Sequence, residues 1–351
     1  MNTPSYFSKK ITFLNVVMTF LIVLRHATPN LRFGLELDGS TPIIYGLNCL
    51  TEAAVPLFFF ISGLLFYYNC SKDVIVSKIK RRFKSLVIPY LLWNTFFFVV
   101  YFVLSHWSFT ASRMNMIAIP CGLTDIVRGI LDSRFTPLWF IKNLIIYTIF
   151  APIIFYFIST KTRAMLTLLL TLVITLLLDF SYDSYFVWLP VYLQGAVLGR
   201  FFYRESSNQG VDALSRCFRT RASYLVMLCL TGICFTGLYI LALWYPDSLL
   251  LYRCFTPILL WVITDFLVGQ YINTSFKVKA WMGAMFFIYC THYFVLNIIQ
   301  KVAVLTFEPT EMFMTLLMIV TPAITIALLL LVASAISKFK VYKILNGGRG
   351  L

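Results

Sequence analysis

The sequence has few charged residues, and this scarcity excludes a water-soluble protein. Charged side chains make up 12% of the 351 residues, whereas a typical soluble domain has roughly 25%. Hydrophobic residues make up 60%, and the mean hydropathy is +0.84. A chain of this composition has too little polar surface to cover a core in water. We therefore expect a protein that crosses a membrane many times.

The motifs of common cofactor sites are also missing. The eight cysteines form no Cys-x-x-Cys pair, and no cluster of His, Cys, Asp and Glu has the spacing of metal ligands. No glycine-rich loop is suited to cradle phosphates. We therefore predict no metal and no bound cofactor. Because no basic stretch outside the membrane is interleaved with stacking aromatic residues, we also predict no nucleic-acid partner.

Apolar runs of about 20 residues recur along the sequence and predict transmembrane helices. The runs are continuously apolar and do not alternate, which argues against a β-barrel. We predict an all-α polytopic membrane protein, a bundle of about ten helices that forms a single domain over residues 1–351 with no fused soluble domain. The predicted spans are 11–28, 50–69, 86–106, 138–158, 164–180, 185–203, 222–244, 250–272, 282–304 and 312–337.

The basic residues predict the orientation of these spans. With the N-terminus in the cytoplasm, most of the 29 Lys and Arg residues fall on the cytoplasmic side, and an even span count places the C-terminus there too. Residues 28–49 and 107–137 are predicted as long outer loops. The second loop holds an amphipathic stretch, Asp125 to Leu131, suited to the membrane surface. The net charge of +15 follows from topology and from attraction to anionic membrane lipids.

Histidine is rare, and two of the three histidines lie inside predicted spans. His26 follows Arg25 near the end of the first run, and His292 lies in the middle of the ninth. Ionisable residues in hydrocarbon are costly, so they are functional candidates by default. A structural histidine, hydrogen-bonded between helices, is the alternative for both. The third histidine, His106, is predicted to lie at the outer interface.

Other polar residues lie in or near predicted spans. Glu52 opens the second span at a depth near His26 and is a candidate to orient that imidazole; a solvated charge at a span end is the alternative. Lys142, one turn after Trp139, either contacts substrate or extends its ammonium group to the outer interface. Asp265, in the eighth span, requires a partner or a cavity, and the sequence does not identify that partner.

Five segments occur in an informative order: LRHA (24–27), PLFFFISGLLF (56–66), KIKRRFKSLVIPYLLWN (78–94), PLWFIKNLIIYTIFAPI (137–153) and IYCTH (288–292). In this order and spacing they resemble the membrane-bound acyltransferase 3 family. Members of that family acylate sugars on bacterial polysaccharides, lipids and antibiotics. The resemblance extends over most of the chain, and the FFFISG and PLWF segments are its most specific parts.

The resemblance implies an integral membrane O-acyltransferase of the bacterial cytoplasmic membrane. It implies transfer of an acyl group, expected to be acetyl, from cytoplasmic acyl-CoA to a hydroxyl of a sugar in a surface polysaccharide or lipid-linked glycan. His26 is implied as general base or acyl relay, with Glu52 and His292 as further catalytic candidates. The substrate-binding candidates are Arg25, Arg81, Arg82, Trp139, Lys142 and Asn15, and of these Arg81 and Arg82 are expected to hold the donor's phosphates.

One position departs from the family pattern, which has an arginine eleven residues before the histidine of the first span. This chain has Asn15 there, about 20° from His26 around a helix and three turns away. Asparagine can form hydrogen bonds but carries no charge. Two other classes stay open: a multi-span transporter or flippase of glycan precursors, and a catalytically inactive homologue that acts as a partner subunit.

Overall fold

The computed structural model describes residues 5–28, 42–108, 118–120, 122–133, 135–202, 221–308 and 310–351. Within these ranges the chain is helical and contains no strand, as the apolar runs predict. The helices are α1 (Tyr6–His26), α2 (Pro42–Thr51), α3 (Ala54–Tyr67), α4 (Lys72–Arg82), α5 (Ile88–His106), α7 (Leu123–Leu131), α8 (Trp139–Ile149), α9 (Ala151–Phe157), α10 (Lys161–Leu177), α11 (Tyr185–Val197), α13 (Arg221–Trp244), α14 (Leu249–Thr274), α15 (Met285–Thr306), α16 (Glu311–Ile336) and α17 (Lys340–Leu345).

Seven helices of the described chain are long and apolar enough to cross a membrane. The helices α8 and α9 together make an eighth candidate, bent by 66°. The remaining two predicted spans correspond to α10, which has 17 residues, and to α11, which has 13 and continues as the π-helical segment Leu198–Phe202. A multi-pass membrane protein is therefore supported, whereas the count of ten spans stays a prediction.

Two predicted boundaries were wrong, and one predicted span is bent. Residues 42–49, predicted as loop, belong to α2, which joins α3 in one candidate span. The third span starts earlier than predicted, because α4 leads through the π-helical segment Phe83–Val87 into α5. The fourth span is bent because Pro152 stands near the start of α9 and lacks the N–H that would continue the hydrogen bonding of α8.

Glycines allow α3 and α11 to approach closely at the centre of the bundle. A Cβ atom at Gly63 would lie 2.1 Å from the carbonyl oxygen of Tyr192, and a Cβ atom at Gly195 would lie 1.8 Å from that of Phe60. Small residues permit such backbone contact between membrane helices, where packing drives association. This contact accounts for the glycine of the FFFISG segment.

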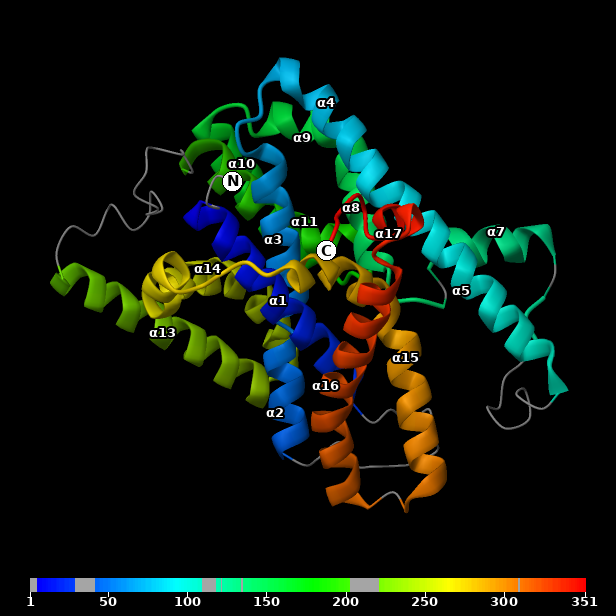
Figure 1. Ribbon diagram of the computed structural model, residues 1–351. Helices are drawn as coiled ribbons and strands as arrows, with labels where there is room; N and C mark the ends of the chain where they lie inside the picture. The colour runs from blue at the N-terminus through cyan, green and yellow to red at the C-terminus, as the bar shows by residue number, and fades with distance from the viewer. Residues whose placement is uncertain are drawn as a thin grey trace.

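The helix α1 crosses the middle of the bundle, in contact with α3, α14, α15 and α16 (Figure 1). The helices α15 and α16 lie side by side and run in opposite directions. Their connection lies at the opposite end of the molecule from α4 and α17 (Figure 1). The end of α1 that carries His26 packs against α15, which carries His292.

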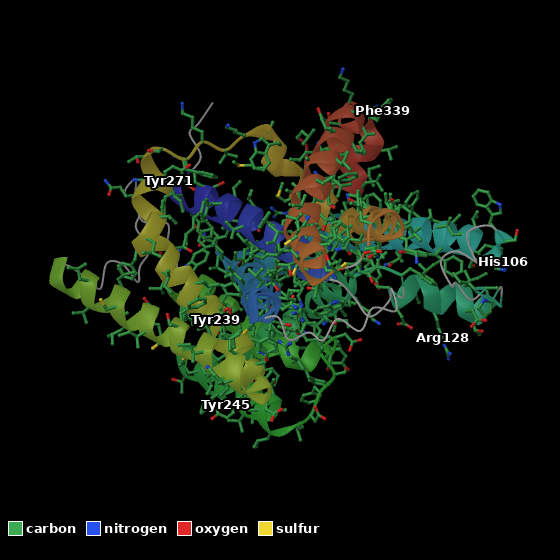
Figure 2. All side chains as sticks on the ribbon, turned by 90° about the horizontal axis from the view of Figure 1, so that it is seen from below. His106, Arg128, Tyr239, Tyr245, Tyr271 and Phe339 are labelled. Atoms are coloured by element: carbon green, nitrogen blue, oxygen red, sulfur yellow. The ribbon has the colours of Figure 1, made fainter. Side chains whose placement is uncertain are left out.

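The amphipathic stretch of the second outer loop forms α7, which packs along α5; Figure 2 labels Arg128 and His106 near the ends of the two helices. The exposed side chains of Leu123, Val127 and Leu131 are four residues apart and share one face of α7. An exposed apolar face suits a helix that lies at the membrane surface. That placement stays a prediction.

The buried charges of α1 and α14 neutralise each other. Lys10 Nζ lies 2.8 Å from the Asp265 carboxylate and 3.6 Å from the ring centroid of Trp261. It also donates a hydrogen bond of 2.9 Å to the Trp261 carbonyl oxygen, and the Tyr6 hydroxyl donates to Asp265. The partner that Asp265 required is therefore a lysine from the first two turns of α1.

Candidate active site

Two histidines from helices far apart in the sequence meet at the centre of the candidate site. His26 is the last residue of α1, and His292 lies in the third turn of α15. Their ring centroids are 5.2 Å apart with the ring planes at 45°. Tyr293 contacts the His26 ring edge-on, also at 5.2 Å. The two candidates that the sequence supplied separately thus form one pair.

The hydrogen bonds of His292 define its tautomer. The Nδ1 atom lies 2.8 Å from the Tyr289 carbonyl oxygen and 3.1 Å from that of Ile288. Because a carbonyl oxygen only accepts, Nδ1 is assigned the proton and Nε2 keeps a lone pair. The Nε2 atom is buried and has no hydrogen-bond partner among the described residues. A buried acceptor without a partner costs free energy if its role is structural alone, and its lone pair is suited to accept a hydrogen bond from a donor that enters the site.

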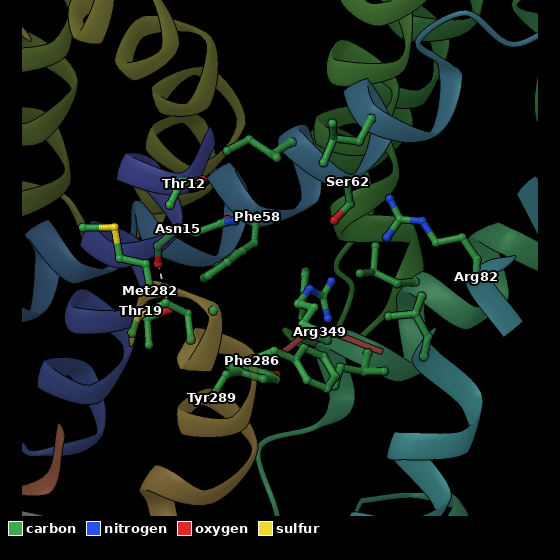
Figure 3. A pocket seen from close by; sticks show the side chains of 18 of the residues that line it. Thr12, Asn15, Thr19, Phe58, Ser62, Arg82, Met282, Phe286, Tyr289 and Arg349 are labelled. Carbon is green, nitrogen blue, oxygen red and sulfur yellow. Dashed lines mark hydrogen bonds between the residues drawn. The ribbon is translucent and has the colours of Figure 1, made fainter. Parts of the chain in front are cut away.

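A cavity of about 320 Å³, called the inner cavity below, extends along α1 toward the histidine pair. Asn15 and Thr19 line it from one side (Figure 3), and the spacing of seven from Thr19 to His26 keeps His26 on the same face of α1. Tyr289 lines the cavity from α15, and its ring centroid lies 6.1 Å from that of His292. Neither histidine lines the cavity, which ends one turn from His292 on α15 and two turns from His26 on α1.

A second, wider cavity of about 640 Å³, called the basic groove below, adjoins the inner cavity. Its walls contain five cationic side chains and no acidic one. Leu65, Arg82 and Arg349 line both cavities, so the two share a wall. The predicted phosphate-binding pair, Arg81 and Arg82, lies in this groove. The cationic residues of the basic groove are Lys78, Arg81, Arg82, Lys84 and Arg349.

The π-helical segment Phe83–Val87 faces both cavities. Ser85 lines the basic groove, and Leu86 lines the inner cavity. Such segments occur frequently at functional sites, because one extra residue per turn changes the direction of the neighbouring side chains. Here the π-helical segment follows directly after Arg82 at the junction of the two cavities.

Arg349 is a site residue that the sequence did not reveal. It was counted only among the basic residues that set the topology, and the single local signal is the glycine-rich run GGRG around it. Its guanidinium lies 4.9 Å from the ring centroid of Phe286. Enclosure by protein, and then the charge of Arg82, lower the pKa of Arg349 to about 10. The residue keeps accessible surface where it faces the cavities and is cationic at neutral pH.

Glu52 is buried between two arginines. Its carboxylate pairs with Arg25 and, over 2.8 Å, with Nε of Arg253, and only 1% of its side chain is exposed. Arg25 also donates a hydrogen bond of 3.3 Å to the Asn48 carbonyl oxygen. The interpretation of Glu52 as a solvated charge was therefore wrong. The carboxylate ties the end of α1, next to His26, to α14; its role in orienting the imidazole stays a prediction.

Trp139 and Lys142 line neither the inner cavity nor the basic groove. Trp139 packs with Tyr182 and Trp188, at centroid distances of 5.1 and 5.7 Å. Lys142 forms an exposed ion pair of 2.8 Å with Asp132, and exposed pairs of this kind contribute about 1 kcal/mol or less. Their proposed contacts with substrate stay predictions.

The family follows from a comparison with known proteins. A family model of the acyltransferase 3 type, described as an acyltransferase domain, matches residues 9–336. The chain belongs to the acyltransferase 3 family. The match includes both histidines and the arginines of α4, and it confirms the resemblance seen in the sequence. No curated protein and no solved structure matches the chain. Family membership together with the apolar helices supports a membrane acyltransferase.

Proposed function

We propose that this acyltransferase moves an acyl group, expected to be acetyl, from cytoplasmic acyl-CoA to a sugar hydroxyl of a surface polysaccharide or lipid-linked glycan. The reaction would take place in the bacterial cytoplasmic membrane, with both termini of the protein in the cytoplasm. The observation that carries the proposal is the contact of His26 with His292, one to two helical turns beyond a cavity that adjoins a basic groove.

The two joined cavities match the two ends of the donor. Coenzyme A carries its phosphates at one end and the thioester at the other, with an uncharged chain between them. The cations of the basic groove suit the phosphates, because charge-assisted hydrogen bonds from arginine to phosphate are strong and directional. The inner cavity, with Phe58, Phe140 and Leu144 in its walls, suits the uncharged chain. The thioester would then lie nearest to Tyr289 and the histidines.

The proposed chemistry needs one proton acceptor beside the thioester. The acceptor hydroxyl attacks the acyl carbon, a new carbon–oxygen bond forms, and the carbon–sulfur bond breaks. His26 takes the hydroxyl proton as the bond forms and returns it to the leaving thiolate. The lone pair on His292 Nε2 accepts a hydrogen bond from protonated His26 and so stabilises it. Histidine suits this role because its ordinary pKa lies near neutrality.

A transfer assay with radiolabelled acetyl-CoA tests the proposal. Membrane vesicles that contain the protein are given the donor on the cytoplasmic face, and label is counted in the glycan and lipid fractions. We expect incorporation by the unaltered protein. A variant with Arg81 and Arg82 both changed to Gln should need a higher donor concentration while inserting normally. An unchanged donor requirement would mean that these arginines serve topology alone.

Asn15 allows the alternatives to be separated in the same assay. It lines the inner cavity at the position where the family pattern has arginine. If the unaltered protein incorporates no label and an Asn15→Arg variant does, the chain is an inactive homologue that this substitution restores. If neither incorporates label, the acyltransferase proposal fails and transport of a glycan precursor becomes the leading function.

A further inference from the structure

The last residues of the chain fold back against the cavities and form part of their walls. The tail, residues 346–351, follows α17 and lies beyond the region that the family model matches. Gly347 and Gly348 have φ angles of +65° and +84°, which only glycine adopts readily. They turn the chain sharply: Gly348 N–H donates a bond of 2.7 Å to the Lys343 carbonyl oxygen. The tail is therefore a defined turn.

Asn346 fixes this tail to the start of α15. Its side chain is fully buried. The Oδ1 atom accepts a hydrogen bond of 3.0 Å from the Phe287 N–H, and Nδ2 donates over 2.9 Å to the Gly283 carbonyl oxygen. Trp93 Nε1 donates over 3.0 Å to the Leu345 carbonyl oxygen from the other side. The tail is thus held between α5 and α15 by groups that satisfy otherwise unpaired backbone atoms.

The fit around the tail glycines is close. A Cβ atom at Gly347 would lie 2.8 Å from the Ser85 carbonyl oxygen of the π-helical segment, and one at Gly283 would lie 2.3 Å from that of Gly350. This packing leaves Arg349 directed toward the cavities. Figure 3 shows Arg82 and Arg349 reaching the inner cavity from different elements.

Arg82 and Arg349 both line the inner cavity and the basic groove, and the charge of Arg82 contributes to lowering the pKa of Arg349. No described carboxylate forms an ion pair with either. Two like charges fixed at one position cost energy unless an anion lies between them. Their position is the junction of the apolar inner cavity and the basic groove.

We propose that the tail is a substrate-binding element, in which Arg349 and Arg82 together hold the diphosphate of coenzyme A. The inference rests on the proposed function for the identity of the ligand. In coenzyme A the diphosphate is the group between the uncharged chain and the nucleotide, and the junction lies between the cavities that suit those two parts. The remaining cations, Lys78, Arg81 and Lys84, lie farther along the groove and face the phosphate of the ribose.

Calorimetric titration of the full-length protein in lipid nanodiscs tests this. The probes are coenzyme A, 3′-dephospho-coenzyme A and pantetheine. Arg349→Gln should weaken binding of the first two by the same factor, about ten- to a hundredfold for a charged hydrogen bond. Binding of pantetheine should not change. Arg349→Lys should recover part of the loss, and the effects of Arg82→Gln and Arg349→Gln should not multiply, because the two side chains share one ligand group.

Lys343→Gln is the matched control, because Lys343 is an exposed cation of α17 that lines neither cavity. It should bind all three probes as the unaltered protein does. Wild-type affinity of Arg349→Gln for coenzyme A would overturn the inference. A larger loss for coenzyme A than for the dephospho form would overturn the assignment to the diphosphate. If Arg349→Gln does not fold, Arg349→Lys is compared with Lys343→Gln instead. Arg349→Lys should then bind coenzyme A more weakly than this control, and equal affinity would overturn the inference. If the Arg349 variants change binding as expected but the unaltered protein transfers no acyl group, the proposed function is rejected and the inference about the tail stands.

Discussion

Replacement of His292 by Asn separates a catalytic role of this residue from a structural one. The amide nitrogen of Asn can take the place of Nδ1 and donate to the carbonyl oxygens of Tyr289 and Ile288, which lie 2.8 and 3.1 Å from Nδ1. It leaves nothing at the position of Nε2, the buried atom without a hydrogen-bond partner among the described residues. The variant therefore keeps the helix contact and removes the acceptor that stabilises protonated His26.

The size of the expected effect follows from that difference. A hydrogen bond to a charged group contributes about 1.5–3 kcal/mol, so His292→Asn should reduce acetyl transfer by about ten- to a hundredfold. Its stability should stay close to that of the unaltered protein. His292→Ala also loses the hydrogen bond, a net contribution of about 0.5–1.5 kcal/mol, and leaves a cavity, so it should melt at a lower temperature.

The assay is transfer from radiolabelled acetyl-CoA at saturating donor, with thermal unfolding measured on the same preparations. A rate for His292→Asn within about threefold of the unaltered rate would refute the reasoning, because it would show that Nδ1 alone matters. An inactive variant that also melts early would be compared with His292→Gln, whose amide can reach the position of Nε2 without being basic.

Three further predictions follow. His26→Gln should be inactive yet stable, since Gln can form hydrogen bonds but cannot take a proton; appreciable transfer by this variant would reduce His26 to a helix contact. Glu52→Gln should lower stability by about 1–3 kcal/mol, because Arg253, with 17% of its side chain exposed, loses its carboxylate partner, whereas Arg25, with 40% exposed, can be hydrated; a melting temperature equal to that of the unaltered protein would contradict this. Reporter fusions at Thr124 and Glu308 should both read as extracytoplasmic, and a cytoplasmic signal at either would break the span count.

The sequence predicted the features that depend on local pattern. Each predicted span corresponds to helix, because apolar runs of this length have no other stable form in lipid. The sequence also singled out the FFFISG segment and the basic stretch before α5. The glycine of FFFISG lies at the α3–α11 contact, and the basic stretch lines the basic groove. Residues 42–49 were placed in a loop because that segment mixes Asn and Gly with apolar residues, yet tertiary packing makes it helical.

The assembly of the site depends on contacts between segments far apart in the chain. Nothing in the spacing of His26 or of His292 indicates that the two rings touch, since helical periodicity gives the face of a helix and not its neighbour. Arg349 escaped notice for the same reason: a basic residue after the last span satisfies the positive-inside rule whether or not it reaches a cavity. Only the folded tail places it beside Arg82.

The ion pair between Lys10 and Asp265 has a consequence for how the protein is made. The two residues are about 255 positions apart, so a ribosome that adds about 5–20 residues per second needs roughly 13–50 s to synthesise the partner of Lys10. During that interval the ammonium of Lys10, at the cytoplasmic end of the first helix, has no counter-charge from α14, and the long lysine side chain would reach for the headgroups instead. The first helix would therefore settle to its final depth only when α14 arrives, which makes the earliest part of the chain one of the last to reach its place. The accessibility of the cysteine in a Lys9→Cys variant, which keeps Lys10, follows that step in chains of increasing length.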